Sequence, residues 1–154
     1  MNKCIKKSNV RHNSIRKKTG SRICSTQVLY GLVFEHNDIN FIINTFLDNY
    51  LFFILKKLNI KEIDIDLFKS IIFGVLKNKD EIDNLISDHL STNWSFDRLS
   101  LTEKIILRSA TYELVFENNF KKVTIINEYV SIMTAFGGNP SFTNAILEKI
   151  YESR

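Results

Sequence analysis

The side chains that could perform chemistry are few in this sequence and far apart along it. His12, His36 and His89 show no spacing typical of a metal site or of a catalytic pair. Two cysteines, Cys4 and Cys24, are too few for a disulfide framework or for a zinc site built of four cysteines. The sequence contains neither a glycine-rich phosphate loop nor a dinucleotide fingerprint. We therefore predict no catalytic residue, no metal site, no cofactor and no small-molecule substrate.

Two other polar features have simple structural explanations. Asp64 and Asp66 are paired carboxylates at an expected helix start, where an acidic side chain caps backbone N–H groups. Arg108 falls on the same helical stripe as Ile105, where an unpaired guanidinium would be costly. We expect Arg108 to pair with a carboxylate such as that of Glu128, and the alternative is a contact with phosphate.

Charge is distributed very unevenly along the chain. Residues 1–24 contain eight Lys and Arg and no Asp or Glu; because the whole chain carries +4, the remainder carries −4. A basic segment on a mildly acidic body favours attraction to a polyanion, and RNA, DNA or an anionic membrane would each fit. An organelle transit peptide or a disordered, solubilising tail would also fit, whereas the absence of a following apolar stretch argues against a secretory signal.

The elements that must position these side chains are predicted to be helices. One proline and five glycines in 154 residues are few for a turn-rich β fold. The longest apolar runs, such as Tyr50–Leu55, are too short to cross a bilayer, so we expect a cytoplasmic protein with no membrane partner. Residues 1–18 lack apolar periodicity and are expected to form a basic, flexible arm, followed by one helical domain over residues 19–154.

Apolar spacing and capping signals predict about seven helices. Ser100 with Glu103 forms a capping-box pattern, Gly137 and Gly138 end a helix, and Asn139 with Pro140 starts the last one. Cys24 lies among apolar residues and is expected to be buried. The predicted helices span Ser21–Glu35, Asp38–Leu55, Asp64–Val75, Asp80–Leu90, Ser100–Glu117, Thr124–Phe136 and Asn139–Tyr151.

Four sequence blocks stand out, namely Arg22–Tyr30, Leu101–Leu114, Ile126–Val130 and Phe142–Lys149. Together they resemble the NusB family of bacterial transcription antitermination factors. Arg22–Tyr30 is similar to that family's first helix, and Leu101–Leu114 to its central helix. Ile126–Val130 (INEYV) and Phe142–Lys149 (FTNAILEK) are similar to its last two helices. The blocks occur in the family's order and extend over about five-sixths of the chain, which leaves only the basic arm outside the resemblance.

The resemblance implies an all-helical fold of two packed small helical bundles and a role in transcription. Family members pair with the ribosomal protein NusE and bind boxA-type RNA. They act within the RNA polymerase antitermination complex, chiefly on ribosomal RNA operons. Two alternatives are a stand-alone RNA-binding module related to the non-catalytic domain of an rRNA methyltransferase, and a structural or membrane-surface helical protein.

The resemblance also implies RNA-binding residues on the first helix. The family's arginine-rich stretch corresponds here to Lys17, Lys18 and Arg22, interrupted by residues 19–21. Such cations neutralise phosphates and add affinity that depends on salt. Gln27 and Tyr30 match family positions that contact RNA or the protein partner, although Tyr30 could instead pack in the core.

The last helix carries two further RNA-binding residues by the same resemblance, Phe142 and Asn144. Phe142 matches an aromatic residue placed to stack on an RNA base; the alternative is a core phenylalanine, and we predict partial exposure. The preceding loop, residues 137–141, is about two residues shorter than in many relatives and lacks their acidic residue.

Glu103 is the residue expected to contact the protein partner. It matches a family glutamate that faces NusE, yet it is also the residue that would close the predicted capping box. The acidic body of the chain would attract a basic ribosomal protein.

Overall fold

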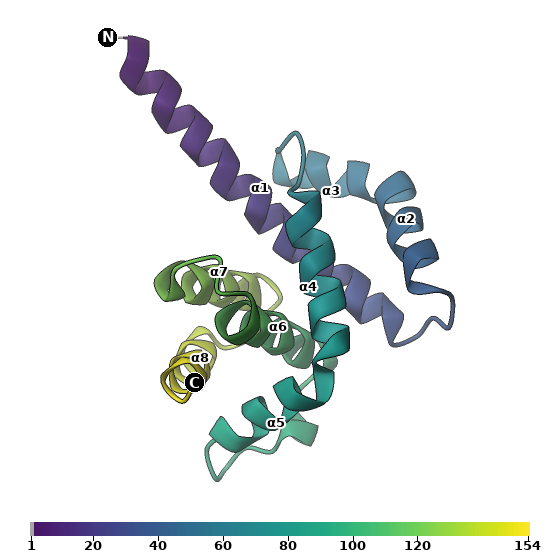
Figure 1. The fold of residues 1–154 in the computed structure, drawn as a ribbon, viewed down its shortest axis with the longest axis vertical. Helices are drawn as coiled ribbons and strands as arrows, with labels where there is room; N and C mark the ends of the chain where they lie inside the picture. The colour runs from purple at the N-terminus through teal and green to yellow at the C-terminus, as the bar shows by residue number, and fades with distance from the viewer. Residues whose placement is uncertain (1) are drawn as a thin grey trace. The chain divides into compact units, whose positions relative to one another are not determined.

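The computed structural model describes residues 2–154, with side chains from Arg16 onward. Within that range the chain forms eight α-helices, a short 3-10 turn and a π-helical segment, and no strand (Figure 1). The predicted all-helical class is therefore confirmed. The chain divides into two compact units, with the division between Ser70 and Ile71 inside α4. None of the helices in the described range is long and apolar enough to span a membrane.

The first unit contains α1 (Asn2–Leu32), α2 (Ile39–Asn49), α3 (Leu51–Leu58) and the start of α4 (Ile65–Lys77). Both α2 and α3 pack against α1 (Figure 1). The flexibility predicted for residues 1–18 stays a prediction, because the side chains of residues 2–15 lie outside the described part.

One predicted helix, Asp38–Leu55, is wrong in its extent, because the chain breaks at Tyr50 into α2 and α3. Asp38 does cap α2, its Oδ2 accepting hydrogen bonds from the N–H groups of Asn40 and Phe41 at 3.1 and 3.3 Å. Tyr50 has φ −115° and ψ −28°, which tilts the path of the next helix. Apolar residues continue at helical spacing across the break, so their pattern does not reveal it.

Small polar side chains line the buried face of α1. Ser21 Oγ donates to the carbonyl of Asp64 at 2.7 Å, and Ser25 Oγ donates to the carbonyls of Ser21 and Phe68 at 2.7 and 3.2 Å. These bonds satisfy hydroxyl groups that would otherwise be costly to bury. Cys24, on the same helix, is fully buried as predicted, and burial raises the pKa of its thiol to about 12.

The second unit contains the end of α4 and four further helices. These are α5 (Lys79–His89), α6 (Leu101–Thr111), α7 (Lys122–Ala135) and α8 (Pro140–Glu152). The 3-10 turn Phe96–Arg98 precedes α6, and the π-helical segment Tyr112–Glu117 continues it. Each of α5, α6 and α7 packs against α8, and α6 also packs against α5 and α7 (Figure 1).

Three predicted boundaries of this unit, the start of α6, the end of α7 and the start of α8, are confirmed by their caps, whereas α5 and α7 begin at Lys79 and Lys122 rather than near Asp80 and Thr124. Ser100 N donates to Glu103 Oε2 at 2.7 Å, and Glu103 N donates to Ser100 Oγ at 3.2 Å, which completes the capping box. Gly137 ends α7 with φ +85°, a backbone angle that favours glycine. Asn139 Oδ1 accepts a hydrogen bond from Phe142 N at 3.0 Å and so caps α8.

Arg108 pairs with Asp83 of α5, so Glu128 as its partner is wrong. The two bonds run from Nε to Oδ1 at 2.6 Å and from Nη2 to Oδ2 at 2.9 Å. The side chains are 11% and 22% exposed, and the guanidinium also lies 5.5 Å from the centre of the Phe96 ring. The expectation of a carboxylate partner is confirmed, and this bidentate bond joins α5 to α6.

Gly74 shows how closely α4 approaches the π-helical segment. A Cβ atom at this position would fall within the ring of Tyr112. The ring is buried there, and it stacks on Phe116 with centroids 6.2 Å apart. Only glycine fits at this point of the helix without moving the tyrosine.

Candidate nucleic-acid interface

The basic residues at the start of the described side chains lie against α3 and the loop that follows it. Arg16 Nη2 donates to the carbonyl of Leu58 at 2.5 Å. Lys17 Nζ lies 3.1 Å from Glu62 Oε1, with the two side chains 38% and 71% exposed. Lys18 is half-buried. An exposed ion pair such as Lys17–Glu62 contributes little to stability, so Lys17 can exchange Glu62 for a phosphate at low cost.

Arg22 does not lie with these cations. It is only 1% exposed and is among the largest fully buried side chains of the described residues. The prediction that Arg22 neutralises an RNA phosphate is therefore wrong for this structure, because its guanidinium is withdrawn from solvent. Its neighbours on α1, Ser21, Ser25 and Thr26, are buried polar residues as well.

Gln27 and Tyr30 lie on the exposed side of α1. Tyr30 is 43% exposed and its ring centre lies 5.5 Å from that of Phe34, so the alternative of a core tyrosine is wrong. Gln27 also lines a groove of about 220 Å³ whose walls include Phe41 and Tyr50. Aromatic rings and an amide side chain at one surface suit the stacking and hydrogen bonding that single-stranded RNA requires.

Phe142 stands in the first turn of α8, where the Asn139 cap fixes its backbone. The side chain is half-buried, so the predicted partial exposure is confirmed. Its ring packs against Trp94, with centroids 5.2 Å apart and planes inclined by 30°. Trp94 is itself 49% exposed, and Asn144, two residues after Phe142, is exposed as well. A half-covered aromatic pair is a suitable stacking surface for a base.

Trp94 is the residue that sequence reasoning missed. Its position in the loop before the 3-10 turn carries no helical pattern, and nothing local relates it to Phe142. Its presence as a large aromatic residue among polar neighbours, Asn93 and Ser95, is the signal that could have drawn attention to it.

Glu103 is half-buried at the start of α6, with one carboxylate oxygen occupied by the cap. Within the described residues, Oε1 makes no hydrogen bond, so it can accept one from a partner while the cap is kept. The predicted capping role is confirmed, and the two roles of this carboxylate are compatible.

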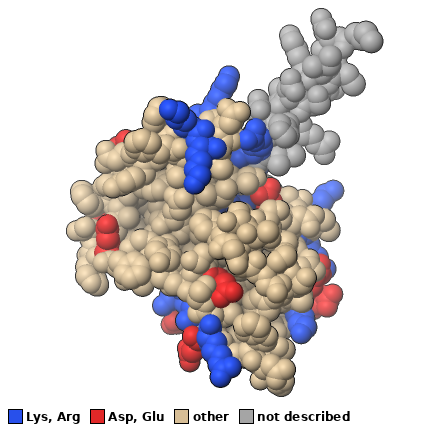
Figure 2. All heavy atoms as spheres, turned by 180° about the vertical axis from the view of Figure 1, so that it is seen from behind, with Lys and Arg blue, Asp and Glu red and all other residues tan. Residues whose placement is uncertain are grey.

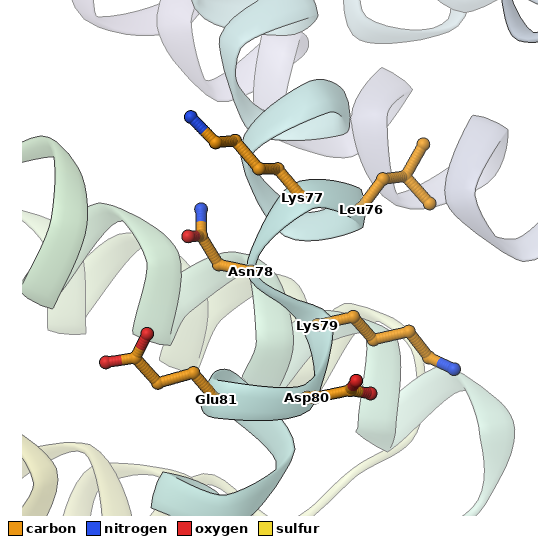
Figure 3. A pocket seen from close by; sticks show the side chains of 6 residues that line it. All are labelled: Leu76, Lys77, Asn78, Lys79, Asp80 and Glu81. Atoms are coloured by element: carbon orange, nitrogen blue, oxygen red, sulfur yellow. The ribbon is translucent and has the colours of Figure 1, made fainter.

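The residues from Arg16 onward contain no group of three His, Cys, Asp or Glu that could hold a metal ion. An open groove of about 380 Å³ lies where α4 meets α5, lined by residues of both signs (Figure 3). Lys77 and Glu81 point to one side, and Lys79 and Asp80 point to the other, so neither side collects charge of one sign (Figure 3).

Comparison with known proteins identifies the family. The model of the NusB family matches residues 19–152. The chain belongs to the NusB family. It is 31% identical to the transcription antitermination protein NusB of Sphingopyxis alaskensis over 88% of this chain and 92% of that one. It is 47% identical to the NusB protein of Fervidobacterium nodosum over a shorter stretch, which covers 54% of this chain and 60% of that one.

Solved structures share the NusB fold. A structure of T. maritima NusB superposes with a TM-score of 0.66 at 29% identity, covering 88% of this chain and 91% of that one. NusB in a structure of the antitermination factors NusB and NusE with dsRNA superposes with a TM-score of 0.68. That match is 23% identical and covers 88% of this chain and 96% of that one, so it supports the fold.

Proposed function

We propose that this chain is a transcription antitermination factor that binds boxA-type RNA together with NusE. The observation that carries the proposal is the alignment to NusB antitermination proteins over nearly their whole length. On this proposal the protein acts in the cytoplasm by binding rather than by catalysis, and it helps RNA polymerase resist termination on ribosomal RNA operons.

Two sets of residues are proposed to contact RNA. Phe142 and Asn144 offer an aromatic face and an amide on α8, with Trp94 extending the aromatic surface. Lys17 and Lys18 supply charge for phosphates, with exposed Gln27 and Tyr30 further along α1. Arg22 is left out of this set because it is buried.

Binding to a boxA-type RNA, with and without NusE, tests the function directly. We expect tighter binding than to a scrambled RNA of equal length, a further gain when NusE is added, and an affinity that falls as salt rises. Equal affinity for both RNAs would reject the proposal. Preference for boxA-type RNA with no gain from NusE would instead favour the stand-alone RNA-binding module.

The role of the basic arm is tested by removing residues 1–15. This truncation keeps Arg16 and Lys17, which contact α3 and Glu62, so the described part of the first unit keeps its contacts. We expect weaker RNA binding and a shallower salt dependence, because fewer counterions are released. Unchanged affinity and an unchanged salt slope would show that the arm is only a tail.

The partner surface is tested by comparing Glu103→Ala with Ser100→Ala. Both variants break the same capping box and should lose about 1 kcal/mol of stability. Only Glu103→Ala also removes the carboxylate proposed to face NusE. A loss of NusE affinity confined to Glu103→Ala supports the interface, and an equal loss in both variants would assign the effect to the cap.

A further inference from the structure

Helix α3 exposes an unusual face for a surface helix. Phe52 and Phe53 are 68% and 65% exposed, and Lys56 and Lys57, one turn later, are exposed as well. Because residues four apart lie on the same side of a helix, these four side chains share one face, here called the α3 face. Apolar residues on the other side of the helix, Leu51, Ile54, Leu55 and Leu58, are half-buried.

Packing within the fold does not explain why Phe52 and Phe53 are aromatic. They lie on the opposite side of α3 from the apolar residues that pack, and their own rings meet edge to face with centroids 5.9 Å apart. Two adjacent, largely exposed aromatic rings are an apolar patch of the kind that marks a binding surface. The helix contains no acidic residue, and neither lysine makes an ion pair with the described residues.

The pairing of flat rings with cations defines the ligand chemistry. A ligand that matches it carries flat apolar groups to stack on the rings and negative charges to meet the lysines. Single-stranded nucleic acid has this combination, with bases that stack on aromatic side chains and phosphates that attract Lys.

The α3 face also adjoins the lysines proposed to bind RNA. The end of α3 is joined to α1 by the bond from Arg16 to the carbonyl of Leu58, and Lys17 reaches Glu62 in the following loop. Asn59 ends α3 in a left-handed conformation, φ 53°, and Lys61 adds another exposed cation in that loop. Cations therefore lie at the described start of α1, in the loop and on the α3 face, with Glu62 of the loop among them. Figure 2 shows Lys and Arg side chains at the upper end of the face drawn there, and further Lys and Arg together with Asp and Glu at its lower end.

We propose that the α3 face is an additional RNA-binding surface, which takes unpaired nucleotides beyond the boxA-type element. The proposal rests on the proposed function, because it extends the path of the same RNA. A second copy of this chain is a poorer occupant, because a symmetric contact would bring Lys56 and Lys57 of both copies together. A membrane surface is also less suitable, because a helix of eight residues offers little area for insertion.

The test compares a boxA-type RNA alone with the same RNA carrying unstructured flanking nucleotides on one or the other side. We expect the flanked RNA to bind the unaltered protein more tightly. The double variant Phe52→Ala and Phe53→Ala should weaken binding of the flanked RNA by about tenfold or more and leave binding of the short RNA unchanged. Phe73→Ala is the matched control, because Phe73 is 40% exposed on α4, a helix to which no RNA contact is assigned.

The lysines are tested by the salt dependence of binding. Lys56→Gln with Lys57→Gln should lower the slope of log affinity against log salt by about 1.4 for the flanked RNA, since each phosphate contact with a single strand contributes about 0.7. Lys69→Gln, which changes an exposed lysine of α4, is the control and should leave the α3-dependent gain intact. Thermal melting of every variant checks that the fold is kept.

The results that would reject the proposed function differ from those that would reject the α3 proposal. No preference of the unaltered protein for boxA-type RNA would reject the proposed function. Normal boxA binding with a gain from flanking nucleotides that survives all four changes would overturn the α3 proposal alone. If the α3 variants keep RNA binding but lose self-association in light scattering, the α3 face would instead bind a second copy of the chain. If they keep RNA binding but lose binding to phosphatidylglycerol vesicles, the face would instead bind a membrane.

Discussion

Replacing Phe142 separates a structural role from an RNA role, because its ring is only partly covered. Full truncation of a buried phenylalanine costs about 3–5 kcal/mol. Phe142 is half-buried, and contact with Trp94 adds about 0.5–1.5 kcal/mol beyond its buried area. We therefore expect Phe142→Ala to lower the free energy of unfolding by about 2 kcal/mol. If the ring also stacks on a base, the folded variant should lose a further 1–3 kcal/mol of RNA binding, roughly 5- to 150-fold.

Trp94 provides the assay for this prediction. It is the only tryptophan of the chain, and its ring lies against Phe142, so its fluorescence reports on the proposed stacking site. RNA should change the emission of the unaltered protein, whereas Phe142→Ala should change the emission before RNA is added and reduce the later response. Urea unfolding followed at the same wavelength measures the stability loss.

Phe142→Leu is the control that keeps apolar bulk and removes the aromatic face. It should retain most of the stability and lose most of the RNA affinity that Phe142→Ala loses. A leucine variant that binds RNA as the unaltered protein does, together with Trp94 emission that RNA does not change, would refute the stacking assignment. Normal RNA affinity combined with a stability loss of about 3–5 kcal/mol would make Phe142 a core residue.

Three further predictions concern the packing that supports these surfaces. Asp83→Asn should lower the free energy of unfolding by about 2 kcal/mol, because it leaves the Arg108 guanidinium without its carboxylate. The double variant Asp83→Leu with Arg108→Met should recover much of this loss. A double variant no more stable than Asp83→Asn would contradict the prediction. Gly74→Ala should lower the free energy of unfolding, although alanine ordinarily stabilises a helix relative to glycine, because the added Cβ enters the space of the buried Tyr112 ring. A raised melting temperature would show that the ring moves away freely. With Cys4 replaced by serine, Cys24 should react with iodoacetamide at least about tenfold more slowly than a free thiol, because the thiol is buried and burial raises its pKa. A rate equal to that of a free thiol, measured by mass spectrometry after timed alkylation, would contradict this.

The features that could be predicted from the sequence are those that depend on neighbours along the chain. The capping box at Ser100 and the start of α8 at Asn139 each combine residue types within four positions, and both form as predicted. Asp64 likewise caps α4, its Oδ1 accepting a hydrogen bond from Leu67 N at 3.0 Å. The partial exposure of Phe142 was also predictable, because a side chain in the first turn of a terminal helix is only partly covered by its neighbours.

The remaining features depend on contacts between distant segments. The resemblance places Arg22 among the cations that contact RNA, whereas the structure buries its side chain. Arg108 needed a carboxylate, but the choice of Asp83 follows from how α5 packs on α6. The aromatic pair of Trp94 and Phe142 likewise joins segments with no relation in the sequence.

The two exposed phenylalanines of α3 also affect how the protein behaves when nothing covers them. Exposed apolar rings favour association between like molecules, and charged residues beside an apolar segment oppose it. Lys56 and Lys57 stand next to Phe52 and Phe53, so like-charge repulsion keeps these surfaces apart in dilute salt. High salt screens that repulsion and strengthens apolar contacts, so concentrated stocks should remain clear at low ionic strength and turn cloudy as salt is added.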